Sequence, residues 1–259
     1  MDPVTGGLVA TAGLVSKDLL LKAFGPTAEY LGGELRNLVE RCNINIEDVC
    51  MAAVRKANGK TFDNSVPPRI AKRVIDDAAY CDSSLVKDYY GGFLCGARQG
   101  DANDDCVPYL SMLKGMSELQ VKTHFLVYSF FHKTYSGKLN TVTNKTGRRQ
   151  SLICLDIAEY MKFIGRPADA WEATINHVVN GLSRLDLIGD YSHFGSPEYL
   201  RTATLGIEMP TASLLVESTI LGVELFLWAA GMNLGHPDAI LDPNTELLNT
   251  FPEEFQNIK

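Results

Sequence analysis

The sequence predicts a mainly α protein, in which a helical N-terminal region is followed by a winged-helix-like region with a small β-hairpin. Apolar residues recur at helical spacing along most of the 259 residues, and the composition, 46% apolar and 21% charged, is ordinary for a soluble folded protein. Residues 117–231 follow the order helix, helix, helix, hairpin, helix of a winged helix. We expect three parts: a helical region, residues 1–116; a winged-helix-like region, residues 117–235; and a C-terminal tail, residues 236–259.

The first expected element is an amphipathic helix over residues 8–24. The uncharged run at residues 6–16 is shorter than the ~20 residues of a transmembrane helix. A secretory leader requires positive charge before its apolar run, and none precedes this one. The apolar spacing favours a helix docked on the protein. Attachment to a membrane surface is the alternative, but the polar face lacks the Lys and Arg content typical of such helices.

A long helix, or two helices in line, follows at residues 31–53. Its apolar residues recur in steps of four and three, which is typical of a seam in a helical hairpin or a self-association interface. Asn43 and Asn45 interrupt the repeat, and this favours the hairpin. Gly59 is well placed to cap the helix.

The next helix opens on two prolines and carries its charges in the reverse of the order that the helix dipole favours. Arg69, Lys72 and Arg73 come first, and Asp76 and Asp77 follow. Two i,i+4 ion pairs would explain this order: Lys72 with Asp76, and Arg73 with Asp77. Alternatively, the three cations face an acidic partner or an anionic ligand, so they are candidate binding residues.

A further helix, capped by Asp82 or Ser83, contains Gly92 and Gly96 one turn apart. A glycine inside a helix costs about 1 kcal/mol relative to alanine, so these two positions indicate a close helix-packing face. A phosphate-binding loop is not indicated, because the Gly-Lys-Ser/Thr ending and a preceding strand are both missing.

No metal or cofactor site is expected. Residues 101–105 resemble the start of a calcium loop, but Cys106 stands where that loop needs Gly and Met112 where it needs Glu. We expect these acids to form a capping loop before the helix at residues 107–116.

The helix at residues 119–135 is apolar on nearly every side and should be central to the fold. His124 and His132 lie on it, separated by ~12 Å along the axis and ~80° around it, so they cannot share one metal ion. Each is expected to be a hydrogen-bonded core or boundary histidine.

The polar loop at residues 137–150 contains four cations and no acid. A solvated loop is the ordinary interpretation, and Lys145, Arg148 and Arg149 are candidate binding residues. The winged order then follows, with these elements: helices at residues 154–164 and 175–182, strand-like segments at 199–209 and 213–219, and a helix at 221–228.

Charge distribution argues against nucleic-acid binding. Residues 167–259 carry three Lys or Arg against thirteen Asp or Glu, and the third helix of the winged-helix-like region offers only Arg184 as a cation. Binding to nucleic acid draws most of its affinity from cations that neutralise phosphates. Such a region suits a basic protein partner better.

The cysteines indicate a reducing compartment. They form no C-x-x-C pair, and most lie beside Val, Leu or Ile, so we expect buried reduced thiols in a cytoplasmic protein and no disulfide framework. They are Cys42, Cys50, Cys81, Cys95, Cys106 and Cys154.

Four motifs resemble, in order and spacing, those of the bacterial abortive-infection alpha family, which is also catalogued as a domain of unknown function. They are residues 25–32 (GPTAEYLG), 67–69 (PPR), 89–92 (YYGG), and 119–124 (LQVKTH) with Tyr128. The likeness covers most of the chain between Leu8 and Trp228. It implies an all-helical bacterial protein associated with defence against phage, and it carries over no catalytic residue.

We therefore expect a non-enzymatic sensor, adaptor or effector of anti-phage, abortive-infection-type defence, which acts through contacts with a protein partner or a second copy of itself. Three alternatives stay open. They are an enzyme that joins Asp76, Asp77 and the acidic loop at residues 101–105 to Arg69 or His124, nucleic-acid binding through the loop at residues 138–149, and membrane permeabilisation by the N-terminal helix.

Overall fold

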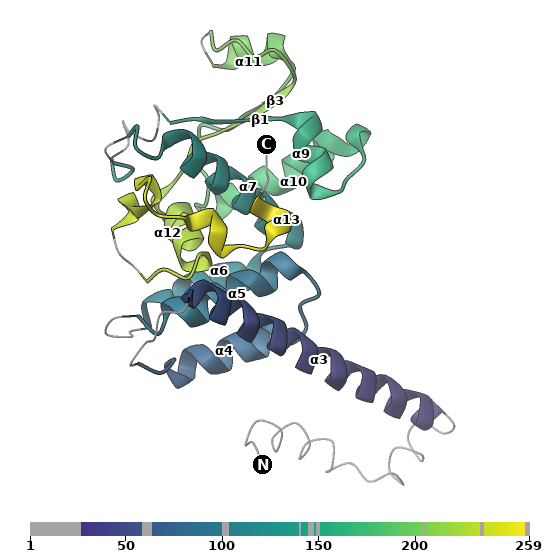
Figure 1. The fold of residues 1–259 in the computed structure, drawn as a ribbon. Coiled ribbons are helices and arrows are strands. Elements are labelled where there is room, and N and C mark those ends of the chain that lie inside the picture. Colours follow the sequence, from purple (N-terminus) through teal and green to yellow (C-terminus); the bar gives the residue numbers. More distant parts are fainter. Residues whose placement is uncertain are drawn as a thin grey trace. The chain divides into compact units, whose positions relative to one another are not determined.

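The computed structural model confirms a mainly helical protein with a small three-stranded antiparallel sheet (Figure 1). Contacts divide the chain into two compact units, Met1–Ile44 and Asn45–Lys259. The structure describes these residues: 27–58, 64–99, 104–139, 141–144, 148, 151–204, 206–233 and 236–256, with the side chains of 27–39 excepted. The amphipathic helix expected at residues 8–24 lies outside them. No helix in the described ranges is long and apolar enough to cross a membrane.

The long helix expected at residues 31–53 is a single element, α3, which spans Thr27–Ala57 and belongs to both units. The residue after it, Asn58, takes a left-handed conformation with φ +46°. The expected cap, Gly59, lies outside the described residues. In the second unit, Val49 and Ala52 of α3 are buried.

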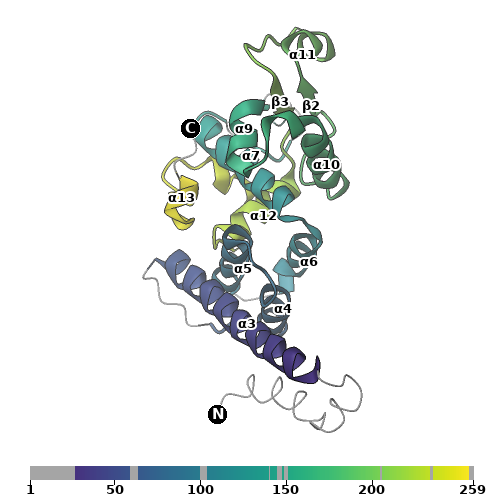
Figure 2. The ribbon, with the colours of Figure 1, turned by 90° about the vertical axis from the view of Figure 1, so that its right-hand side faces the viewer.

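Four elements follow α3 in the second unit: α4 (Pro68–Ala78), α5 (Ser84–Gly96), the 3-10 helix η1 (Asp104–Cys106) and α6 (Val107–Gly115). The apolar face of α4 buries Ile70, Val74 and Ala78. Most of α5 is buried, and α5 contacts both α4 and α12 (Ile220–Ala229). Figure 2 shows α4, α5 and α6 side by side.

The glycines of α5 permit two close helix contacts. A Cβ on Gly92 would lie 2.6 Å from the carbonyl oxygen of Trp228 in α12, and one on Gly96 would lie 2.7 Å from Cζ3 of the same residue. A Cβ on Gly91 would lie 2.5 Å from the Cβ of Ala52 in α3. The predicted packing face at Gly92 and Gly96 is therefore confirmed.

The central helix is α7, which spans Glu118–Tyr135 and contacts α5, α10, α12 and strand β1. It begins with a capping box, in which the Ser117 side chain accepts from the Gln120 backbone and the Gln120 side chain accepts from the Ser117 backbone. Its burial on most sides confirms the central position expected from its composition.

The winged-helix-like region consists of β1 (Ile153–Asp156), α9 (Ile157–Ile164), the 3-10 helix η2 (Ala168–Ala170), α10 (Trp171–Arg184), β2 (His193–Gly195), α11 (Pro197–Ala203), β3 (Ser213–Val216) and α12. The sheet order is β1-β3-β2, and β3 is antiparallel to both neighbours. In register, Leu215 lies opposite both Cys154 of β1 and His193 of β2.

Two expectations for this region were wrong. Cys154 lies in β1 and not in a helix, because Asp156 ends the strand and caps α9 by accepting from the Glu159 backbone. The segment expected as a strand at residues 199–209 begins within α11. Ser196 caps this helix by accepting from the Tyr199 backbone, and Pro197 occupies its first turn.

The expected C-terminal tail packs against the core. It forms the 3-10 helices η3 (Pro237–Leu241) and η4 (Leu247–Thr250) and the short helix α13 (Glu253–Gln256). Phe251 is fully buried, with ring centroids 4.8 Å from Phe125 and 5.5 Å from Phe226.

All six cysteines are unpaired, but the expectation that most are buried was wrong. Cys95 and Cys106 are buried, whereas Cys50 and Cys154 are exposed. Exposure of Cys154 follows from its place in β1, where alternate side chains face out of the core.

Candidate functional site

The candidate recognition surface of the winged-helix-like region is the outer face of α10. Ile175, Val178 and Leu182 are buried on the inner face, at the spacing expected of one helical stripe. The exposed side chains are Glu172, Ala173, Asn176, His177, Asn180 and Arg184. Arg184 is the sole cation among them, as the sequence indicated.

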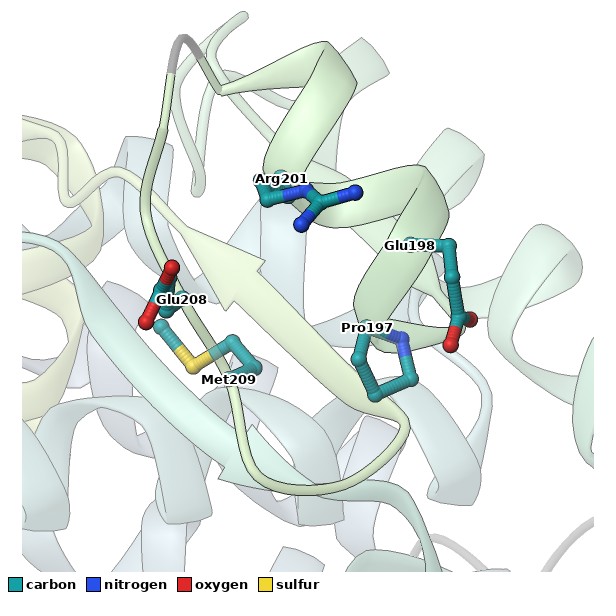
Figure 3. A pocket seen from close by; sticks show the side chains of 5 residues that line it. All are labelled: Pro197, Glu198, Arg201, Glu208 and Met209. Carbon is teal, nitrogen blue, oxygen red and sulfur yellow. The ribbon is translucent and has the colours of Figure 1, made fainter.

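We call β2, β3 and the segment between them the wing; it carries the inserted helix α11, which stands at the outer end of the sheet (Figure 1). A hollow of about 290 Å³ opens beside it (Figure 3). Glu198 and Arg201 of α11 line one side, and Glu208 and Met209, from the segment before β3, line the other. Tyr199 is 53% exposed on the same helix.

Two of the predicted cations on α4 are engaged in surface ion pairs. Arg69 pairs with Asp104 of η1 at 2.5 Å, and Lys72 pairs with Asp76 at 2.5 Å. The predicted ion pair between Lys72 and Asp76 is therefore confirmed. Both pairs are exposed, so each contributes little to stability.

The predicted pair between Arg73 and Asp77 was wrong. Arg73 donates through Nη2 to the Ser111 hydroxyl at 2.6 Å, and Asp77 pairs with Lys114 at 2.5 Å. Both partners come from α6, which packs against α4 and offers a polar side chain to each residue. Arg69 and Arg73 are thus bound to neighbouring elements, and Lys72 is bound within α4.

Of the three candidate binding residues in the cationic loop, the structure describes only Arg148, and this side chain binds the backbone of its own loop. Arg148 donates through Nη1 to the carbonyl oxygens of Val142 and Thr143, at 3.2 and 3.3 Å. Lys145 and Arg149 lie outside the described residues. Arg148 therefore organises the loop backbone.

Both histidines of α7 are hydrogen-bonded, as predicted. The fully buried His124 donates through Nε2 to the Gly222 carbonyl at 3.0 Å and accepts at Nδ1 from the Tyr89 hydroxyl at 2.9 Å. Burial lowers the pKa of His124 to about 3, so the ring is neutral at physiological pH. His132 bonds through Nδ1 to the Ile240 carbonyl at 2.7 Å. His124 does not join the acids of α4, because both of its nitrogens are bonded in the core.

A buried ion pair that the sequence did not reveal connects α3, α5 and the C-terminal segment. Lys56, whose side chain is fully buried, contacts Asp88 at 2.6 Å and donates to the Thr250 carbonyl at 3.0 Å. Arg55 also pairs with Asp88. Burial lowers the pKa of Lys56 to about 8. The Lys56 ammonium lies 4.0 Å from the centre of the Phe251 ring, a cation–π contact.

Over the described ranges, no three His, Cys, Asp or Glu side chains converge in a way that could hold a metal ion.

No family model, no curated protein and no solved structure matches this chain. The resemblance to the abortive-infection alpha family therefore rests on the four motifs quoted above.

Proposed function

We propose that this protein is a non-enzymatic sensor, adaptor or effector that works through protein contacts made by α10 and the wing. One observation carries the proposal. The helix that corresponds by chain order to the DNA-reading helix of a winged helix, α10, exposes neutral and acidic side chains, with Arg184 as its only cation.

The charge of this surface disfavours nucleic acid. A protein that binds a duplex places several Lys or Arg against phosphates, and this neutralisation supplies most of the affinity. Glu172 lies in the first turn of α10, and Glu198 and Glu208 line the hollow of the wing. These carboxylates would repel a phosphate backbone.

The wing has the features of a protein-contact surface. Tyr and Arg are enriched among the residues that dominate binding energy at interfaces. Tyr199 and Arg201 both project from α11, and the adjacent hollow also offers Pro197 and Met209 as apolar lining (Figure 3). Charges of both signs beside apolar side chains give a surface with orientation-specific contacts.

The resemblance to the abortive-infection alpha family supports a role in bacterial defence against phage, in the cytoplasm. The mainly helical fold agrees with what that resemblance implies. A defence protein of this kind would sense a phage product or pass a signal to an effector through the α10 and wing surface.

Phage challenge of a bacterial host that expresses the chain tests this proposal. We expect wild-type protein to lower the plating efficiency of at least one phage in a diverse panel. The double variant Tyr199→Ala, Arg201→Ala should restore plating while circular dichroism and melting temperature stay unchanged. The control is Lys162→Ala, whose side chain is 80% exposed on α9. Protection that persists in the wing variant, or no protection by well-expressed wild-type protein, would contradict the proposal.

A further inference from the structure

A second hollow lies where α4 and α6 end and α5 and α7 begin. It is open to solvent and has a volume of about 490 Å³, within the size range of small-molecule sites. Four carboxylates line it, against one ammonium group, that of Lys114. The lining acids are Asp76, Asp77, Asp82 and Glu118.

Three of these carboxylates form ion pairs with lysines, and one of the three is Asp77, which pairs with Lys114 at 2.5 Å. Lys72 pairs with Asp76 at 2.5 Å, and Lys122 pairs with Glu118 at 2.9 Å. Asp82 forms no ion pair with any other described residue. The uncompensated negative charge of the hollow is therefore concentrated near Asp82.

One buried polar atom in the wall lacks a partner, and a tyrosine hydroxyl in the same wall is not hydrogen-bonded to the described residues. The side chain of Asp77 is 3% exposed; its Oδ1 contacts Lys114, but its Oδ2 has no hydrogen-bond partner in the described structure. Tyr90 is 3% exposed, and its hydroxyl forms no hydrogen bond with another described residue. Tyr90 and Asp77 line the same hollow. Buried polar groups in proteins normally have partners.

We propose that this hollow binds a primary ammonium group at the end of an apolar chain. An ammonium group carries three donors and no acceptor, which suits the free Asp77 oxygen, the Asp82 carboxylate and the Tyr90 hydroxyl. Val86, Leu113 and Met116 supply an apolar wall for the stem. Such a group occurs on a lysine side chain of a partner protein or on a free aliphatic diamine. This site is separate from the α10 and wing surface.

Isothermal titration calorimetry tests the site with three probes. Cadaverine represents a free amine, an N-acetylated lysine amide represents a protein side chain, and 1,5-pentanediol has the length of cadaverine without its charge. We expect saturable millimolar binding of at least one amine and none of the diol. Binding of both amines marks a general ammonium site, whereas binding of one alone identifies its source.

Matched variants identify the residues. Asp82→Asn, at an exposed turn, and Asp77→Asn should each weaken binding by about tenfold or more, because each removes a charged acceptor. Tyr90→Phe should weaken it by a smaller factor. Glu159→Gln, on the exposed surface of α9, should bind like wild type. If Asp77→Asn does not fold, binding by Asp82→Asn still tests the proposal, because Asp82 is exposed. No amine binding by wild type, or binding that Asp82→Asn leaves unchanged, would overturn the proposal.

Discussion

His124 is a neutral side chain in the core that bridges two helices by hydrogen bonds. Its ring joins the Tyr89 hydroxyl of α5 to the Gly222 carbonyl of α12, and it lies tilted by 42° against the Tyr128 ring, with centroids 4.7 Å apart. A proton added to Nδ1 would remove an acceptor and place an unpaired charge in the core. Such a charge is strongly destabilising.

This geometry predicts acid-sensitive stability. The pKa of His124 is about 3 in the folded protein and near 6.5 in the unfolded chain, so the unfolded state binds more protons between these values. The free energy of unfolding should therefore fall as pH drops from 6.5 towards 3, by up to about 5 kcal/mol from this residue. Urea denaturation over that pH range measures the effect.

His124→Gln should reduce the change in the free energy of unfolding between pH 6.5 and pH 3. The variant should also be less stable than wild type near pH 7. His177→Gln, which removes an exposed histidine of α10, should leave the dependence intact. An unchanged slope in His124→Gln would show that other groups control acid unfolding.

The two buried polar residues His124 and Lys56 differ in how far sequence could predict them. The role of His124 followed from the apolar composition of its own helix. Burial of Lys56 depends on Thr250 and Phe251, 194 and 195 residues away. Adjacent Arg55 and Lys56 in the last turn of α3 look like ordinary solvated cations, and only the folded C-terminal segment covers one of them.

At the scale of elements, the contact between α5 and α12 depends on glycine. Gly92→Leu should abolish folding or reduce the melting temperature strongly, because a side chain would meet the backbone of Ala229 and Trp228. Overpacking costs about 1–3 kcal/mol, and backbone atoms cannot move aside as side chains do. Soluble yield and thermal melting measure the change.

Gly115→Ala is the matched control, since nothing lies within 4 Å of a Cβ at that position at the end of α6. It should fold with a melting temperature equal to or above that of wild type, because alanine is the better helix former. If Gly92→Leu is as soluble and stable as wild type, the close contact with α12 does not hold in solution.

Helices with long apolar periodicity were predictable, and elements fixed by local caps or by neighbours were less so. The periodic stripe of α10 identified it from sequence. Residues 199–209 alternate like a strand, and this pattern predicted a strand. The helix-start signal at Ser196 and Pro197 is only two residues long, but it determines the structure there. The partner of Asp77 could not be read from spacing, because Lys114 comes from a packed helix and competes with the i,i+4 neighbour Arg73.

Across the second unit, one hydrophobic core extends from Val49 of α3 to Phe251 of the C-terminal segment. The helical region and the winged-helix-like region therefore share their interior, whereas their charges differ. Residues 67–166 contain fourteen cations against ten acids, and residues 167–259 contain three against thirteen. The candidate amine site lies among the residues of the first set, and the α10 and wing surface belongs to the second.

The charge of the winged-helix-like surface leads to the last prediction, that the protein does not bind duplex DNA through α10. Labelled duplexes should show no saturable binding at physiological salt, because specific binders neutralise several phosphates and α10 exposes one cation, Arg184. Weak association at low salt should disappear in the triple variant of the loop, Lys145→Ala, Arg148→Ala, Arg149→Ala. Fluorescence anisotropy at several salt concentrations measures both. Saturable binding that survives the triple change and is lost with Arg184→Ala would show that α10 enters a groove, and the proposed protein-contact role of this face would then fail.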